Sequence, residues 1–94
     1  FYFIEALQEA ALELGLAPAA ARRLALETFT GAAKLAAAST DDAATLRARV
    51  TSKGGTTAAA IACMEDAAVK PAIVRAVKAA DQRARELGDE LGAE

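Results

Sequence analysis

The chain has 94 residues, a formal net charge of −2 and an aromatic content of only 4%, with acidic and basic residues interspersed. This charge creates no field that attracts a phosphate backbone, and so few rings leave little for bases to stack on, so we expect no nucleic-acid partner. One cysteine and no histidine rule out an internal disulfide and an ordinary zinc site, so we also expect no metal.

The length suits one small domain over residues 1–94, near the lower limit for a chain that buries its own core. Hydrophobic residues make up 54% of the chain, and alanine is the most frequent of them. Leu, Glu, Arg and Lys are also common in the chain. All of these residues favour helix, so we expect an all-α fold of about five helices.

The cellular location is predicted from what the sequence lacks. No apolar run approaches the roughly 20 residues that cross a bilayer, and no signal-peptide pattern is visible. We therefore expect a cytoplasmic protein without a membrane partner. The chain starts at Phe1 directly within an apolar helical pattern, which we interpret as a helix cut inside a longer protein.

Two helices are predicted for the first half. The first should end at Gly15, since a glycine commonly follows the last helical residue. One face of this helix carries apolar residues at steps of four and three, namely Phe3, Leu7, Ala11 and Leu14. The second should run from about Pro18 to Ala38, because proline fits the first helical position. Its predicted stripe is formed by Ala21, Leu24, Thr28, Gly31 and Leu35. The very small Gly31 in this stripe predicts a close helix crossing.

Two shorter helices follow. The run from Ser39 to Asp42 matches a capping box, which predicts a third helix that starts after Ser39 and ends near Val50. A fourth helix is expected from Thr56 or Thr57 to about Ala67.

The fifth helix has the most regular apolar pattern. It should start at Pro71 and carry one stripe at repeating steps of four and three, formed by Ile73, Val77, Ala80, Ala84, Leu87 and Leu91. Because helices lined by alanine bury little area each, we expect long helix faces, above all the last, to be covered by a partner.

The stretch VTSKGGTTAAAI interrupts the helical pattern, and we call its residues 50–55 the glycine loop. Adjacent glycines give access to backbone angles that side chains forbid, and they permit a ligand to approach the main chain. A helix that begins at Thr56 would present free N–H groups and a partial positive charge. The loop therefore fits an anion such as a carboxylate or a phosphate. The alternative is an ordinary turn, with Thr56 as an ordinary helix cap.

Other chemical candidates are weaker. Cys63 lies inside a predicted helix, and without a histidine to activate it we interpret it as a small core residue. The carboxylates near the C-terminus stand beside Arg83 and Arg85, so they indicate a solvated face.

The segments FIEALQEAALELGL, GAAK and VTSKGGTTAAAI, in this order and at these distances, resemble the C-terminal domain of pyrroline-5-carboxylate reductase. The resemblance implies an all-α dimerisation domain that normally follows a Rossmann domain, which is absent from this chain. It also implies a homodimer of interlocked helical domains, further assembly into decamers in many members, and reduction of 1-pyrroline-5-carboxylate to L-proline with NADPH or NADH. The cofactor would be bound mainly by the N-terminal domain.

The resemblance also implies roles for individual residues. The substrate carboxylate would be held by the backbone around Ser52, Gly54, Gly55 and Thr56. Thr57 would hydrogen-bond the ring nitrogen and is the candidate catalytic residue, although an ordinary alcohol is a poor general acid.

The chain departs from the family pattern at two places. Many members have proline where this chain has Lys53, which would leave the loop less rigid here. Arg49 stands where the family has an Asn-like residue. The competing interpretations are a related imine or hydroxyacid reductase, and a non-catalytic helical oligomerisation module.

Overall fold

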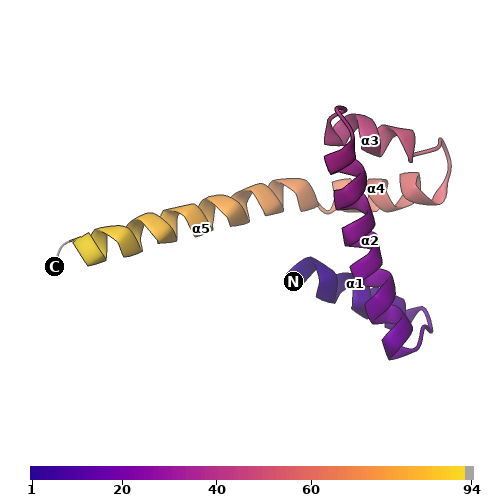
Figure 1. Ribbon diagram of the computed structural model, residues 1–94, viewed down its shortest axis with the longest axis horizontal. Coiled ribbons are helices and arrows are strands. Elements are labelled where there is room, and N and C mark those ends of the chain that lie inside the picture. The colour runs from indigo at the N-terminus through magenta and orange to yellow at the C-terminus, as the bar shows by residue number, and fades with distance from the viewer. Residues whose placement is uncertain (93–94) are drawn as a thin grey trace. The chain divides into compact units, whose positions relative to one another are not determined.

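The computed structural model describes residues 1–92, and these residues form five α-helices with no strand among them (Figure 1). The helices are α1 (Tyr2–Glu13), α2 (Pro18–Ala38), α3 (Ala43–Arg49), α4 (Thr56–Asp66) and α5 (Val69–Gly92). The all-α prediction is therefore confirmed. Internal packing divides the chain into two compact units, one of residues 1–49 and one that starts at Val50. The single domain over residues 1–94 stays a prediction.

The first helix ends at the predicted glycine. Gly15 adopts a φ of +99°, and its N–H donates to the carbonyl of Leu12 at 3.0 Å. The N–H of Leu16 donates to the carbonyl of Ala11, also at 3.0 Å. These two bonds form a Schellman motif, in which the left-handed residue is usually glycine.

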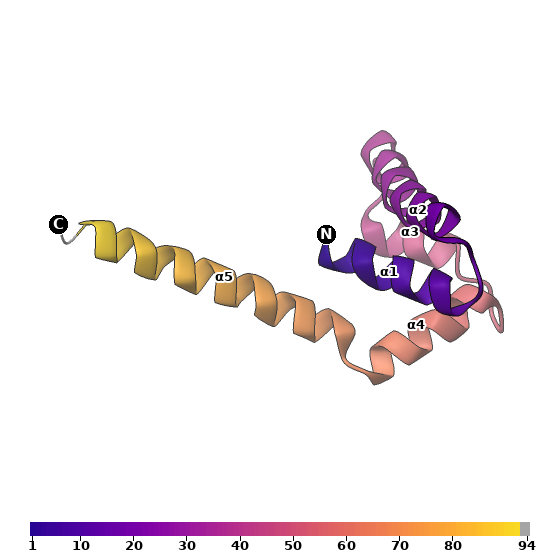
Figure 2. The ribbon, with the colours of Figure 1, turned by 90° about the horizontal axis from the view of Figure 1, so that it is seen from below.

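The core of the first unit is a seam of alanines where α1 packs against α2 (Figure 2). Ala11, Ala21 and Ala25 are buried, with relative exposures of 3%, 1% and 0%. Small methyl groups allow close approach but remove little area from water. Much of the predicted apolar stripe of α2 thus stays open, and Leu35 is 70% exposed.

Gly31 makes no close helix crossing within the described chain. A Cβ built at Gly31 finds no heavy atom within 4 Å. Cys63 is likewise exposed, so its assignment to a core is wrong for residues 1–92. Both predictions require neighbouring residues that pack over Gly31 and Cys63, and residues 1–92 do not provide them.

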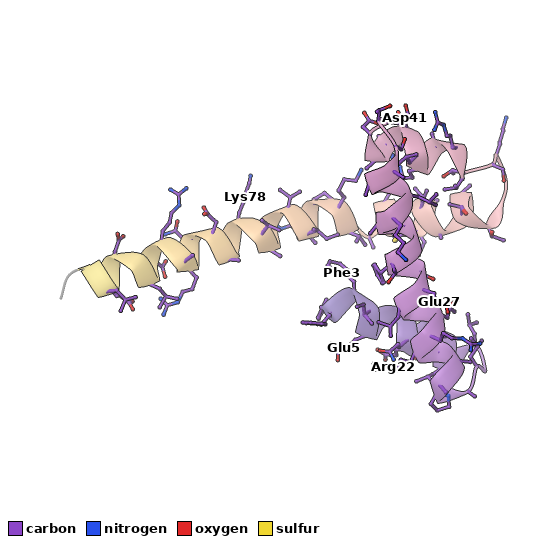
Figure 3. The ribbon with its side chains drawn as sticks, viewed as in Figure 1. Phe3, Glu5, Arg22, Glu27, Asp41 and Lys78 are labelled. Atoms are coloured by element: carbon purple, nitrogen blue, oxygen red, sulfur yellow. The ribbon has the colours of Figure 1, made fainter. Side chains whose placement is uncertain are left out.

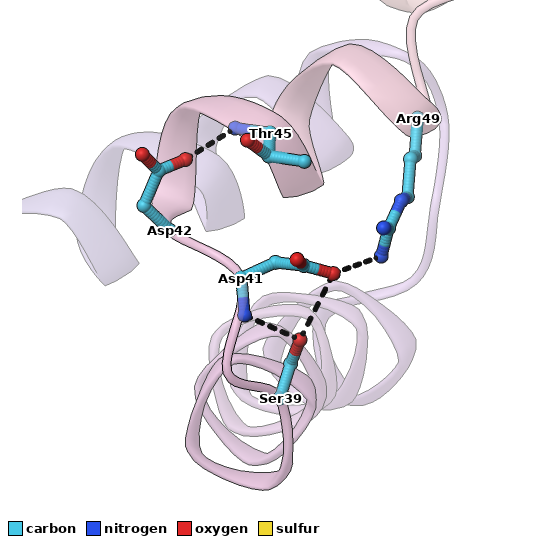
Figure 4. Close-up of polar contacts among 5 residues, drawn as sticks. All are labelled: Ser39, Asp41, Asp42, Thr45 and Arg49. Carbon is cyan, nitrogen blue, oxygen red and sulfur yellow. Dashed lines mark hydrogen bonds and ion pairs between the residues drawn. The ribbon is translucent and has the colours of Figure 1, made fainter.

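The third helix is capped by a different residue from the one predicted (Figure 4). Oδ1 of Asp42 accepts a hydrogen bond from the N–H of Thr45 at 2.8 Å. The Ser39 hydroxyl instead accepts from the N–H of Asp41 at 3.0 Å. The capping box on Ser39 is wrong because the helix begins only at Ala43.

In the second unit, two residues separate α4 from α5, and the second of them is in the left-handed region. Ala68 has a φ of +54°, and its carbonyl accepts from the N–H of Ala72 at 3.1 Å. The fifth helix therefore begins at Val69, and Pro71 lies within its first turn. Proline is tolerated there because the first N–H groups of a helix have no partner in the helix.

The fifth helix has no buried residue. Its predicted apolar stripe remains open to solvent, and Val77 and Leu91 are 64% and 73% exposed. Other positions are charged, such as Lys78, which projects from the ribbon (Figure 3). Along residues 1–92, no helix combines the length and the apolar character needed to span a membrane.

Candidate functional site

The glycine loop is built on a tight turn. The N–H of Gly55 donates to the carbonyl of Ser52 at 3.0 Å, which places Lys53 and Gly54 at the two central positions. Gly54 has a φ of +74°, whereas Lys53 is not in the positive-φ region. This combination defines a type II turn, whose third residue is normally glycine.

Gly55 is required for a different reason. Its φ of −86° and ψ of −179° are extended angles that any residue adopts. A Cβ at Gly55, however, would collide with Oγ of Ser52 and would lie 3.2 Å from the carbonyl oxygen of Ser52. Gly54 thus supplies the predicted backbone angle, whereas Gly55 leaves room for Ser52. The approach of a ligand to the main chain stays a prediction.

The fourth helix starts directly after this turn. Gly55 is its N-cap and provides no side-chain cap, so Thr56 is the first helical residue and not the cap. The carbonyl of Gly55 accepts the first bond of the helix from the N–H of Ala59 at 3.1 Å. The N–H groups of Thr56 and Thr57 precede that bond and lie at the positive end of the helix dipole. This arrangement favours an anion at the start of α4.

The structure brings all five predicted site residues together in one short stretch. Ser52, Gly54 and Gly55 form the turn, and Thr56 and Thr57 form the start of the helix that follows. Ser52 and Thr56 are exposed, whereas Thr57 is half-buried. Among residues 1–92, no group of His, Cys, Asp or Glu side chains is arranged to hold a metal ion.

Sequence reasoning missed an ion pair just before the loop. Nη1 of Arg49 lies 2.6 Å from Oδ2 of Asp41, and the hydroxyl of Ser39 donates to the same carboxylate oxygen at 3.4 Å (Figure 4). The sequence signal that could have revealed this ion pair is the pair of opposite charges, Asp41 and Arg49, at the two ends of a seven-residue helix. The sequence alone predicts Asp41 only as part of a capping motif and Arg49 only as a departure from the family pattern.

The neighbouring carboxylate of Asp42 is also perturbed. Its pKa lies below the ordinary value of 3.8, first because the Thr45 backbone N–H donates to it and second because of the Thr45 hydroxyl. Both hydrogen bonds favour the ionised carboxylate. Asp42 therefore caps α3 as an anion at neutral pH.

Comparison with known proteins shows which family has this arrangement of helices. A family model described as pyrroline-5-carboxylate reductase dimerisation matches residues 1–87. The chain belongs to this family. The resemblance drawn from the glycine loop and its flanking helices is thereby confirmed.

Individual members of the pyrroline-5-carboxylate reductase family are similar over nearly the whole chain. The pyrroline-5-carboxylate reductase of Pseudomonas aeruginosa is 41% identical over 92 residues, which cover 98% of this chain and 34% of that protein. The enzyme of the same name from Synechocystis is 42% identical over 85 residues, or 90% of this chain and 32% of that protein. The chain thus spans about a third of the length of these relatives.

A solved structure shares the fold. The crystal structure of Plasmodium falciparum pyrroline carboxylate reductase with NADP bound matches with a TM-score of 0.80 at 29% identity. The match covers 83% of this chain and 31% of that one.

Proposed function

We propose that this chain is the dimerisation and substrate-binding domain of a pyrroline-5-carboxylate reductase, which reduces 1-pyrroline-5-carboxylate to L-proline with NADPH or NADH. The observation that carries the proposal is the glycine loop, which leads into the N-terminus of α4 in a chain of the dimerisation family. The proposed substrate is a small cyclic imine with a carboxylate, and the loop offers N–H donors at the positive end of a helix dipole, which a carboxylate can bind.

The backbone around Ser52, Gly54, Gly55 and Thr56 holds the substrate carboxylate in this proposal. The type II turn fixes the direction of the peptide groups, and the start of α4 adds N–H donors and the positive end of the helix dipole. Hydrogen bonds to a charged group contribute about 1.5 to 3 kcal/mol each. Two or three of them would hold the ring in one orientation.

Thr57 is proposed as the contact of the ring nitrogen. Thr57 lies in the first turn of α4 and directly follows Thr56, the last of the residues whose backbone is proposed to hold the carboxylate. The nicotinamide cofactor, when bound, supplies a hydride to the imine carbon and becomes NAD(P)⁺, while the ring nitrogen gains a proton. Thr57 orients that nitrogen and is not required to be the proton donor. The main cofactor contacts belong to an N-terminal nucleotide-binding domain in this proposal.

The open helix faces support a homodimer. The stripe on α5 exposes Val77 and Leu91, and burial of such side chains stabilises by about 1.5 to 3 kcal/mol each. A second copy of the chain, seated on these faces, would supply the core that α5 lacks. We also propose that these dimers assemble into decamers and that the protein is cytoplasmic.

The proposal is tested with the full-length gene product. Oxidation of NADPH and of NADH is followed with 1-pyrroline-5-carboxylate and, as a matched control, with 1-pyrroline, which lacks the carboxylate. We expect kcat/KM for the carboxylate-bearing imine to be at least about tenfold higher, the loss expected when one charge-assisted hydrogen bond is absent. Equal rates on the two imines would indicate a different imine reductase. No turnover of either would favour a non-catalytic assembly module.

A further inference from the structure

We propose that Lys53 gives the glycine loop a preference for substrates that carry a carboxylate, through the positive charge that it adds beside the start of α4. The proposal rests on the proposed function and deepens it, because it assigns a specificity-determining residue to the same site. Lys53, the glycine loop and α4 all lie in the unit that starts at Val50. Lys53 takes no part in the hydride transfer.

The charges at the start of α4 are arranged against the stability of the helix. A helix is stabilised by acidic groups near its N-terminus and by basic groups near its C-terminus. α3 follows this rule, with the ionised Asp42 as its cap and with Arg47 and Arg49 in its last turn. α4 does not, because no side chain caps it, its first turn contains no acidic residue, and a lysine precedes it in the loop. Lys53 and the dipole of α4 therefore add to the same positive potential.

The turn itself gives no reason for a lysine. Lys53 occupies the second position of the type II turn, where proline is common. Its side chain is exposed, and within the second unit, as far as residue 92, it takes part in no ion pair. No acidic residue occurs between residues 50 and 64. The charge of Lys53 is thus not neutralised by the local sequence.

Lys53 is close enough for an anion at the start of α4 to be attracted to it. Three peptide units join Lys53 to Thr56, so their Cα atoms are at most about 11 Å apart, and the bond from Gly55 to Ser52 folds this segment into a turn. The Debye length is about 8 Å at physiological ionic strength, so salt screens the attraction only in part. A bound carboxylate would also give α4 the anion that Asp42 gives to α3. An imine without a carboxylate gains neither interaction.

The size of the effect is limited by exposure. Attraction between exposed charges changes an equilibrium constant by up to about fivefold. We therefore expect loss of the Lys53 charge to raise KM for 1-pyrroline-5-carboxylate by about two- to fivefold. The value of kcat should change less than about twofold, because the carboxylate keeps its charge throughout the reaction.

The test compares 1-pyrroline-5-carboxylate with 1-pyrroline in the full-length gene product. Lys53→Gln should raise KM for the first imine and leave KM for the second unchanged, whereas a disturbed turn would affect both. Lys53→Arg keeps the charge and should keep the preference, and Lys53→Glu should weaken it further than Lys53→Gln. Lys78→Gln makes the same change of charge at an exposed position of α5 and is the matched control, with both KM values unchanged.

The dependence on salt is a second readout, which a purely structural role of Lys53 would not change. Added salt should raise KM for 1-pyrroline-5-carboxylate more steeply in the parent protein and in Lys53→Arg than in Lys53→Gln, because salt screens the Lys53 charge. Parallel salt profiles in the parent and in Lys53→Gln would refute the role of Lys53. Equal increases in KM for both imines would refute it as well.

The proposed function fails separately, if the parent protein turns over neither imine. Binding of L-proline, measured by titration calorimetry, would then still decide on Lys53. Affinity about two- to fivefold weaker in Lys53→Gln than in the parent would support its role, and equal affinity would refute it. A parent protein that neither turns over the imines nor binds L-proline would refute both proposals.

Discussion

Gly55 donates its N–H to the carbonyl of Ser52 at 3.0 Å, and it is also the position at which a Cβ would collide with the Ser52 hydroxyl. A side chain at Gly55 would force the Ser52 hydroxyl out of its observed position. The first residue of α4 follows immediately, so a change in the turn would also move the start of the helix. The loop and the helix N-terminus therefore act as one local structure, and substitutions in the turn should affect the whole site.

Lys53→Pro should stabilise the turn. Lys53 occupies the second position of a type II turn, where proline is common because its ring fixes the required φ. Restriction of the unfolded chain at a compatible position stabilises by about 0.4 to 1 kcal/mol. Denaturant unfolding measures this gain. Gly54→Ala is the opposite case, since a side chain at a φ of +74° should destabilise the fold. A loss of stability in Lys53→Pro would contradict the assigned turn type.

Gly55→Val should abolish most of the proposed activity while the dimer persists. Its branched side chain would displace Ser52 and move the amides that hold the carboxylate. Loss of one such hydrogen bond costs about 1.5 to 3 kcal/mol, so kcat/KM should fall at least about tenfold. Gly88→Ala is the control, because a Cβ built there finds open space. Steady-state rates and light scattering are measured together, and unchanged turnover would refute the loop assignment.

Most of the fold is predictable from apolar spacing and from two special residues. Gly15 and Pro18 marked where α1 ends and α2 begins, and the structure places both as expected. The start of α5 was not predictable, because the break is made by Ala68, a strong helix former with a φ of +54°. Nothing in an alanine signals a left-handed conformation, so the sequence predicts a start at Pro71.

The site was predictable in part. The five loop residues follow from the local sequence because a turn and a helix N-terminus are local structures. The contact between Asp41 and Arg49 was not predictable, since it depends on how a seven-residue helix folds back on the turn before it. The capping role of Asp42 was missed for a related reason: Ser39 and Asp42 both fit a cap, and only the observed helix start decides between them.

Ala68→Gly should stabilise the second unit. A left-handed conformation costs a residue with a Cβ about 1 to 2 kcal/mol, and glycine avoids this cost at the expense of greater freedom in the unfolded chain. We expect a net gain of about 0.5 kcal/mol or more in the free energy of unfolding. Ala67→Gly is the matched control, because Ala67 has a φ of −83° and gains nothing from glycine. Equal losses in both variants would mean that Ala68 is not left-handed.

The cap of α3 should weaken in acid. The pKa of Asp42 is lowered in the folded chain, mainly by the Thr45 N–H. Its stabilising contribution is therefore complete above the ordinary value of 3.8 and is lost as the pH falls through the lower, folded-state pKa. Asp42→Asn keeps a capping oxygen but does not titrate. Unfolding measured between about pH 5 and pH 2 should show a smaller acid loss in this variant than in the parent. Identical pH profiles would contradict the assignment.

Val77→Asp should dissociate the proposed dimer without unfolding the monomer. Val77 is 64% exposed in the described chain, so a carboxylate there costs the isolated chain little. In a dimer that covers the stripe of α5, the same carboxylate would be buried without a partner, and the apolar contact, worth about 1.5 to 3 kcal/mol, would be lost. The dissociation constant should rise at least about tenfold by light scattering over a dilution series. Lys78→Asp, the adjacent position outside the stripe, should leave it nearly unchanged. A Val77→Asp protein that remains as tightly dimeric as the parent would show that this stripe lies outside the interface.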